Sequence, residues 1–368
     1  MRVPLKNSSL RHFGMICFLL LISLVVFYGL NHSLNLTLPS LENHNMEFAK
    51  AIQSEFSSFS AKNSTSPLSL HSKVITPQSH PPMTNGGVIF FYHLYKCGGI
   101  TIRAFAKTVN PQRVHFRRLV PAAKSFDSAD REIRQYFLAN STTPQKILFV
   151  EHHGEKSILD MAERFSQWRD LSAKTQKPLF LFTAVREPVA LAVSYFNFFH
   201  VAPGSYPYVD PLYEPTEANL IHHSIPNHAL RMMIQGGRAT QNASSSSIGI
   251  SQIPSCCQSL PHRHDEQACL WKVLDTYIDW VGTTEDLSHE TLPLLSWLIQ
   301  GEFNAKNAKR RNVASTNQTT KIELDKLSMT SRNELLTMNN DAATFWRRVP
   351  RMFTLKGFDE MNKNHSRK

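Results

Sequence analysis

The chain has 368 residues, which leaves room for one large domain with appendages, because single domains average about 100–200 residues. Its formal net charge of +11 at pH 7 indicates an acidic partner. Nucleic acid would be the usual partner of a basic nuclear protein, but the N-terminal segment directs this chain to a different compartment.

An apolar segment spans residues 13–30 (FGMICFLLLISLVVFYGL) and contains no charged residue. As a helix with a rise of about 1.5 Å per residue it is about 27 Å long, just enough to cross a hydrocarbon core of about 30 Å. Arg2, Lys6 and Arg11 precede it, so residues 1–12 are expected to form a cytoplasmic tail.

A cleaved signal peptide is the alternative interpretation of this segment. The apolar part of a signal peptide is usually only about 7–15 residues long and ends in a small-residue cleavage site, and no such site follows Tyr28. We therefore predict an uncleaved signal-anchor and a single-pass type II membrane protein. Its acidic partners would then be sulfated or uronic-acid glycans and nucleotide cofactors, with no nucleic acid.

Residues 31–85 are rich in Ser, Asn, Thr, Pro and His and show no sustained helix or strand period. This composition predicts a flexible lumenal stem that holds the following domain, residues 86–368, away from the bilayer. The predicted lumenal part carries N-x-S/T sequons at Asn31, Asn35, Asn63, Asn140, Asn242, Asn317 and Asn364. Two of Cys256, Cys257 and Cys269 could form a disulfide in an oxidising lumen, and the pairing stays open.

Short apolar runs and helical patterns alternate from residue 88 onward. The runs that predict strands buried on both faces are residues 88–92, 147–150, 179–185 and 277–282. The segments that predict helices are residues 101–109, 156–171, 189–199 and 291–300. Buried strands that alternate with helices predict an α/β domain built around a central parallel sheet.

Two further features lie toward the C-terminus. Ser331 and Glu334 have the spacing of a capping box, which predicts a surface helix that runs to Arg348. Residues 239–266, which include a run of serines, are interpreted as an insertion or a long loop.

The loop after the first predicted strand, YKCGGIT, is typical of an anion site. In a parallel sheet, ligands bind beyond the carboxyl ends of the strands. Successive backbone N–H groups in a glycine-rich turn that leads into a helix form a cradle for an anion. Lys96 adds a movable positive charge and Thr101 a hydroxyl, whereas the full triphosphate loop G-x-x-x-x-G-K-[ST] is absent from the sequence.

The same stretch also fits a different chemistry. Cys97 and Arg103 have the C-x5-R spacing of a cysteine phosphatase, in which a thiolate attacks and the arginine clamps the phosphate. Such loops normally have a glycine three residues after the cysteine and Ser or Thr after the arginine, where this chain has Ile100 and Ala104. We therefore favour the phosphate cradle.

The second loop follows the predicted strand at residues 179–185. Arg186 stands at its tip, Pro188 suits the first position of the next helix, and Ser194 lies about two turns along. The planar fork of arginine suits a phosphate, and a serine hydroxyl can add a bond to the same group. The alternative is a surface ion pair between Arg186 and Glu187.

The third loop follows the predicted strand at residues 147–150 and contains His152 and His153. Histidine can act as a general base because its ordinary pKa of about 6.5 is close to lumenal pH. Adjacent side chains usually point different ways, so we expect at most one of the two in the chemistry. No metal is predicted, because no third ligand stands at a diagnostic zinc spacing.

Together these loops resemble those of the membrane-bound Golgi carbohydrate sulfotransferases, nearest to the heparan and uronyl 2-O-sulfotransferase branch. The resemblance runs from residue 88 to the C-terminus and is best in residues 88–103 and 179–199. It implies a P-loop-like three-layer domain in the Golgi lumen. It also implies transfer of a sulfuryl group from 3′-phosphoadenosine 5′-phosphosulfate to a glycan hydroxyl.

The resemblance further implies a role for each loop. The loop that would bind the 5′-phosphosulfate consists of Lys96, Cys97, Gly98, Gly99, Ile100 and Thr101. Lys96 would also stabilise charge on the leaving group, Arg186 and Ser194 would bind the 3′-phosphate, and His152 or His153 would deprotonate the acceptor. The branch has two histidines around one glycine where this chain has His-His-Gly, which leaves the base and the acceptor position open.

Two other functions stay open at this point. A Golgi glycosyltransferase shares the anchor and stem, although the D-x-D motif of many metal-dependent ones is absent from the sequence. A non-catalytic glycan-binding protein could have the same fold. Basic pairs such as Arg117-Arg118 and Arg347-Arg348 favour an anionic glycosaminoglycan as acceptor, and the sequence leaves a homo-oligomer open.

Overall fold

The computed structural model describes residues 72–119, 125–139, 145–153, 156–201, 213–236, 254–258, 260, 265–304 and 321–358. The chain divides into two units, Met1–Ser69 and Leu70–Lys368, and all described residues belong to the second. The predicted cytoplasmic tail and signal-anchor lie outside the described residues. Within the described segments, no helix combines the length and the apolar character needed to cross a membrane.

The described residues form a central sheet of five parallel strands in the order β3-β4-β2-β5-β6. These strands are β2 (Gly87–His93), β3 (Val114–Leu119), β4 (Ile147–His153), β5 (Leu179–Val185) and β6 (Trp280–Thr283). Every residue of β2 and β5 is buried, as expected for central strands covered on both faces. The α/β class with a central parallel sheet, predicted from the apolar runs, is confirmed.

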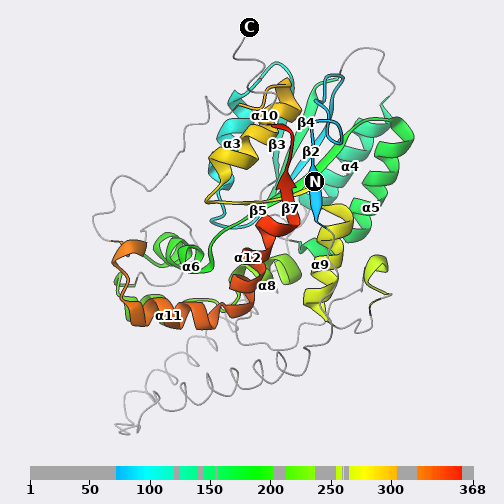
Figure 1. The fold of residues 1–368 in the computed structure, drawn as a ribbon. Coiled ribbons are helices and arrows are strands. Elements are labelled where there is room, and N and C mark those ends of the chain that lie inside the picture. Colours follow the sequence, from blue (N-terminus) through cyan, green and yellow to red (C-terminus); the bar gives the residue numbers. More distant parts are fainter. Residues whose placement is uncertain are drawn as a thin grey trace, which may run out of the picture. The chain divides into compact units, whose positions relative to one another are not determined.

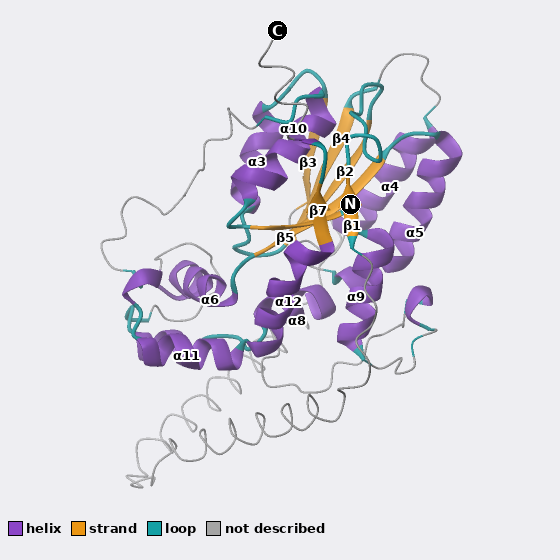
Figure 2. Ribbon diagram, in the orientation of Figure 1, coloured by secondary structure: helices purple, strands orange, loops and turns teal. Residues whose placement is uncertain are grey.

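Helices cover both faces of the sheet, which gives the domain three layers (Figure 1, Figure 2). One face is covered by α3 (Gly99–Thr108) and α10 (Leu292–Gln300). The other face is covered by α4 (Ser125–Leu138), α5 (Ile158–Thr175) and α9 (Glu266–Tyr277). The predicted strand at residues 277–282 begins only at its fourth residue, because α9 continues through Tyr277.

Further helices complete the described part of the domain. They are α6 (Pro188–Phe196), which continues as the π-helix η1 (Asn197–Val201), α7 (Glu217–His222), α8 (His228–Gln235), α11 (Met329–Met338) and α12 (Asn340–Met352). Of these, α6 and α11 lie at the lower left of Figure 1. Short helical turns are η3 (Ser255–Cys257), η4 (Leu287–Thr291) and η5 (Leu324–Lys326).

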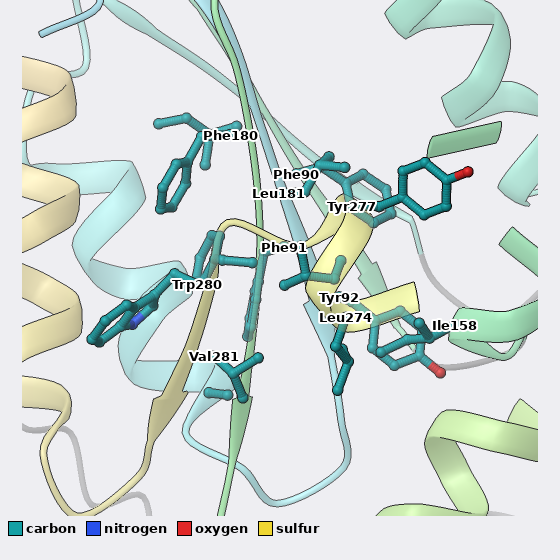
Figure 3. Packing of buried hydrophobic residues seen from close by; sticks show 14 of the residues in the cluster. Phe90, Phe91, Tyr92, Ile158, Phe180, Leu181, Leu274, Tyr277, Trp280 and Val281 are labelled. Atoms are coloured by element: carbon teal, nitrogen blue, oxygen red, sulfur yellow. The ribbon is translucent and has the colours of Figure 1, made fainter. Parts of the chain in front are cut away.

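Aromatic side chains of β2 serve both layers of the core. Phe90 packs against Trp168 of α5 with ring centroids 5.1 Å apart, whereas Phe91 stacks on Phe182 of β5 at 4.8 Å. Successive strand residues point to opposite faces, so a continuous apolar run fills both layers at once. Figure 3 shows further members of this core around the central strands.

The start of α6 is defined by local signals. Pro188 is its first residue, as predicted, and the Glu187 carboxylate accepts hydrogen bonds from the backbone N of Val189 and of Ala190. Glu187 therefore acts as a helix cap. The alternative of a surface ion pair between Arg186 and Glu187 is wrong.

The structure corrects the predicted boundary between stem and domain. β1 (Lys73–Ile75) pairs in parallel with β7 (Phe353–Leu355), and Nζ of Lys73 donates to the carbonyl of Ile278 at 2.6 Å. Residues 72–85 therefore pack with the domain, and residues 31–71 lie outside the described residues. A strand of three residues is too short to give a detectable period, which is why the sequence pattern missed it.

The single helix predicted near the C-terminus is two helices, α11 and α12, that meet at Asn339. The cap of α11 is Ser328, whose hydroxyl accepts from the backbone N of Ser331, so the predicted capping box of Ser331 and Glu334 is wrong. Glu217 of α7 accepts hydrogen bonds from both serine hydroxyls. This contact between distant segments selects the earlier serine, and a local pattern cannot reveal it.

One disulfide joins Cys257 of η3 to Cys269 of α9. Among the described residues, Cys97 and Cys256 are free. The pairing that the sequence left open is thus resolved in favour of Cys257 and Cys269. This bond ties the end of the predicted insertion to the helical layer.

Candidate functional site

The neighbouring strands β2 and β5 mark the point where the chain changes direction across the sheet. After β2 the chain passes to β3 at one edge, and after β5 it passes to β6 at the other. Open α/β sheets bind ligands at such a switch point, beyond the carboxyl ends of the strands. The loops that follow β2 and β5, which the sequence singled out, therefore meet at this point.

Residues 96–101, called the cradle below, turn from β2 into α3. Lys96 and Gly98 have φ angles of 61° and 78°, in the left-handed region, and α3 begins at Gly99. The first N–H groups of a helix have no carbonyl partner inside it and attract anions. The helix begins two residues earlier than predicted, which places the amides of Gly99 and Ile100 in its first turn.

Both glycines of the cradle are required by close neighbours. A Cβ on Gly98 would lie 2.4 Å from Cδ1 of Leu287, and a Cβ on Gly99 would lie 1.9 Å from Nε2 of His93. The two positions therefore leave no space for a side chain. At these two positions, Leu287 and His93 occupy the space that a side chain would need.

Two cations converge beside the cradle. Nη1 of Arg186 donates to the carbonyl of Lys96 at 3.2 Å, and Nε of Arg186 is buried without a hydrogen-bond partner in the described part of the chain. Nζ of Lys96 lies 4.0 Å from the ring centroid of Phe198, a cation–π contact. Burial, followed by the charge of Arg186, lowers the pKa of Lys96 to about 8, so it is still largely charged at neutral pH.

Cys97 and Arg103 do not form a phosphatase site. Burial raises the pKa of Cys97 to about 12, so the thiol is protonated at neutral pH and cannot act as the nucleophile. Arg103 is engaged by Glu151, to which it donates through Nε at 2.7 Å and through Nη2 at 2.5 Å. The interpretation of the C-x5-R spacing as a phosphatase motif is therefore wrong.

His152 points away from the cradle, into the layer of α4 and α5. Its ring lies 5.5 Å from that of Phe126, and neither ring nitrogen has a hydrogen-bond partner among the described residues. Burial lowers the pKa of His152 to about 4. The side chain is enclosed and neutral at physiological pH.

His153 points to the opposite face, as expected for the neighbour of His152 in a strand. Its ring meets the ring of Tyr95 edge-on at 4.3 Å and that of His93 edge-on at 4.4 Å. Burial, followed by the neighbouring His93, lowers the pKa of His153 to about 3, so the ring is neutral at physiological pH. Because Tyr95 directly precedes Lys96, His153 lies beside the cradle.

Ser194 is half-buried on α6, in the second turn after the loop that carries Arg186. In the described residues no hydrogen bond joins the two side chains. The structure therefore brings together Lys96, the cradle, Arg186 and His153, and it places Ser194 on the adjoining helix without direct contact.

Sequence reasoning missed Glu151 and the role of His93. Glu151 is fully buried in β4, and Nδ1 of His93 lies 2.8 Å from its Oε1. Burial raises the pKa of Glu151, but hydrogen bonds from Arg103 and His93 outweigh this effect and lower the pKa to about 2. A carboxylate directly after an apolar strand run needs buried partners, and that requirement is the signal that could have indicated the cluster.

The described residues contain no group of three or more His, Cys, Asp or Glu side chains that could hold a metal ion. The predicted insertion also contains a His-x-His pair, His262 and His264, which lies outside the described residues. What the fold and the site define is an α/β domain with a candidate anion site at its switch point. No protein-family model matches this chain, and comparison with curated proteins finds no match either.

Proposed function

We propose that this protein is a sulfotransferase that moves a sulfuryl group from 3′-phosphoadenosine 5′-phosphosulfate to a hydroxyl of a glycan. The observation that carries the proposal is the convergence of Arg186 with the cradle between β2 and β5. Helix-terminal amides suit one phosphate and an arginine fork suits a second. A donor with phosphates at both ends requires two such sites.

The side chains present fit this donor. An unsatisfied buried N–H costs about 1–3 kcal/mol, and Nε of Arg186 has no partner among the described residues, so a phosphate oxygen there would remove that cost. The amides of Gly99 and Ile100, in the first turn of α3, are proposed to donate to the 5′-phosphosulfate. Ser194, on the adjoining helix, is proposed to add a hydrogen bond to the 3′-phosphate.

In the proposed reaction the bond between sulfur and the phosphate oxygen breaks while a bond from sulfur to the acceptor oxygen forms. Lys96 stabilises the negative charge that develops on the phosphate oxygen. Its contact with Phe198 is worth about 0.5–2 kcal/mol, and a doubly charged phosphate offers a stronger partner. Catalysis then consists of positioning and charge stabilisation, by analogy with phosphoryl transfer.

We assign the role of general base to His153 and not to His152. His153 lies beside the cradle, where an acceptor hydroxyl could reach it. Its pKa of about 3 makes it a weak base in the ligand-free protein, so the proposal requires the anionic donor and acceptor to raise that pKa on binding. His152 faces the opposite layer among aromatic side chains. The sequence alone allowed either residue.

The acceptor is proposed to be an anionic glycosaminoglycan-type polysaccharide. Arg118 is exposed on the edge strand β3, opposite Glu151 in register, and its charge contributes to the lowered pKa of His153. We propose that this exposed cation, which acts on the pKa of the proposed base, favours an acidic sugar. We propose that the enzyme acts in the Golgi lumen, held by the predicted anchor at residues 13–30.

The test uses the purified full-length protein, donor labelled with radioactive sulfur and a panel of glycans, followed by disaccharide analysis of the product. Label in an anionic polysaccharide, lost in Lys96→Ala, is the expected result. Binding of adenosine 3′,5′-bisphosphate without transfer to any acceptor would instead indicate a non-catalytic glycan-binding protein. Transfer of sugar from a nucleotide sugar would indicate a glycosyltransferase.

A further inference from the structure

A buried cluster of His93, Glu151 and Arg103, called the carboxyl-end triad, joins α3 to β2 and β4. Oε1 of Glu151 accepts hydrogen bonds from Nη2 of Arg103 at 2.5 Å and from Nδ1 of His93 at 2.8 Å, and Oε2 accepts from Nε of Arg103 at 2.7 Å. Both oxygens of a fully buried carboxylate are thus engaged. Paired in this way, the carboxylate stays ionised and fixed in place.

The orientation of His93 follows from this pairing. An ionised carboxylate only accepts hydrogen bonds, so Nδ1 of His93 carries the proton and donates to Glu151. Burial lowers the pKa of His93, and the neutral ring has a lone pair on Nε2. Nε2 faces Gly99 of the cradle, while the ring lies edge-on to His153. One imidazole therefore contacts both the cradle and the proposed base.

A histidine, an arginine and a carboxylate also meet at the opposite end of the sheet, in a cluster called the amino-end triad, whose carboxylate is an aspartate. Oδ2 of Asp279 accepts from Nη2 of Arg169 at 2.5 Å and from the backbone N of Leu181 at 2.7 Å, and Nε2 of His80 lies 3.7 Å from Oδ1. Arg169 also donates to the carbonyl of Tyr277. These contacts tie α5, α9 and β5 together.

We propose that Arg103, Glu151 and His93 are positioning residues for the donor site and for the base. Arg103 holds Glu151, Glu151 holds the ring of His93, and that ring sets the positions of Gly99 and of the His153 imidazole. This inference rests on the proposed function. Positioning matters in such a site because a displacement of about 1 Å can reduce the rate on the order of 10²-fold. In this proposal Arg103 holds the Glu151 carboxylate and does not clamp a phosphate.

Two variants of His93 in the full-length protein test the proposal. His93→Asn keeps an N–H near the position of Nδ1 and therefore a donor to Glu151, whereas His93→Leu keeps bulk and removes the donor. Calorimetric titration with adenosine 3′,5′-bisphosphate gives Kd at a temperature where circular dichroism shows each variant folded. We expect His93→Leu and Glu151→Gln to weaken binding about tenfold, and His93→Asn to weaken it less.

Asp279→Asn is the matched control, because it removes the buried charge of the amino-end triad. It should lower the unfolding temperature and leave Kd unchanged. Wild-type Kd in folded His93→Leu and Glu151→Gln would overturn the proposal. Failure of the wild-type protein to bind the bisphosphate at all would overturn the proposed function instead, so the two failures are distinguishable.

If the His93 variants do not fold, Gly99→Ala and the double variant with His93→Ala test the same proposal. In Gly99→Ala the new methyl group meets Nε2 of His93, and Gly99 has no positive φ, so that clash is the main defect. We expect Gly99→Ala to weaken bisphosphate binding and the added His93→Ala to restore part of it. Unchanged binding in Gly99→Ala would overturn the proposal.

Discussion

The two ends of the central sheet use the same residue types in different ways. At the amino end, Nζ of Lys177 donates to the carbonyls of Tyr136, Phe137 and Ala139 at 2.8–3.1 Å. At the carboxyl end, Nζ of Lys96 rests on an aromatic ring. The amino-end lysine is saturated with backbone partners, whereas the carboxyl-end lysine is available to an anion.

The two triads extend this contrast. The amino-end triad contacts backbone groups of the layers that it joins, and the carboxyl-end triad contacts the cradle and His153. Buried polar groups are normally fully paired, so unpaired donors such as Nε of Arg186 mark the places where a ligand could complete the pairing. The difference between the two lysines lies in their partners and not in their residue type. His152, unpaired but enclosed by aromatic rings, shows that a missing partner marks a candidate site only where a ligand has access.

We expect the largest difference in transfer rate between substitutions of the two lysines, Lys96 and Lys177. Lys96→Ala should reduce sulfate transfer by about 10³-fold, because one preorganised charge at the leaving group is lost, and should leave the fold intact. Lys177→Ala should lower the unfolding temperature and leave the rate per folded molecule unchanged. Transfer rates from labelled donor, together with thermal unfolding, measure both. Equal loss of rate in the two variants would break the comparison.

Acid unfolding should reveal the charge on the carboxyl-end triad. The pKa of Glu151 falls from its ordinary 4.5 to about 2, so its contribution is fully present above pH 4.5 and disappears as the pH falls through 2. The difference corresponds to about 3 kcal/mol of unfolding free energy at neutral pH. Denaturant titrations between pH 6 and pH 3 should therefore show a shallower pH dependence for Glu151→Gln than for wild type; equal slopes would contradict this assignment.

Substitutions of the adjacent residues His152 and His153 should differ in their effect on the transfer rate. His153→Ala should lower the transfer rate by at least about 10²-fold, since the proton acceptor is lost. His152→Leu should leave the rate near wild type, because that side chain lies in the opposite layer. Steady-state rates at saturating donor distinguish the two. A strong loss in His152→Leu with activity retained in His153→Ala would reverse the assignment.

The smallest expected effect is at Ser194. Ser194→Ala should raise the KM for the donor by roughly threefold to tenfold, as for loss of one hydrogen bond of about 0.5–1.5 kcal/mol, and should leave kcat nearly unchanged. The control is Ser172→Ala, which removes a hydroxyl that donates to the carbonyl of Lys177 near the amino end. An unchanged donor KM in Ser194→Ala would remove this residue from the site.

The sequence could predict the central sheet because β2 and β5 are continuous apolar runs, and only a strand buried on both faces requires such a run. It could also place Lys96 and Arg186 after the carboxyl ends of two strands, where parallel sheets bind ligands, whereas the structure shows that these strands are neighbours. β1 could not be predicted, because its partner β7 lies far away in the sequence. The same holds for the cap of α11, which Glu217 stabilises from another helix.

The sequence could predict the cationic side chains of the candidate site, but not the buried residues that hold the site in place. The sequence indicated that His152 and His153, as adjacent residues, point different ways, but it placed them in a loop, whereas both belong to β4. Which of them borders the cradle depends on the register of β4 against β2. The partners of Glu151 come from an adjacent strand and from α3, so no local pattern reveals them. In the sequence, Arg103 matches the C-x5-R spacing of a cysteine phosphatase. Only its contacts in the structure show that it binds the Glu151 carboxylate.

The central claim is that the carboxyl end of the sheet binds a nucleotide with phosphates at both ends. Calorimetric titration of the full-length protein with adenosine 3′,5′-bisphosphate, beside adenosine 5′-monophosphate, tests it most directly. We predict one bisphosphate per chain, much weaker binding of the monophosphate, and loss of that preference in Arg186→Ala. Equal affinity of the folded wild-type protein for the two nucleotides, or no binding of either, would contradict the claim.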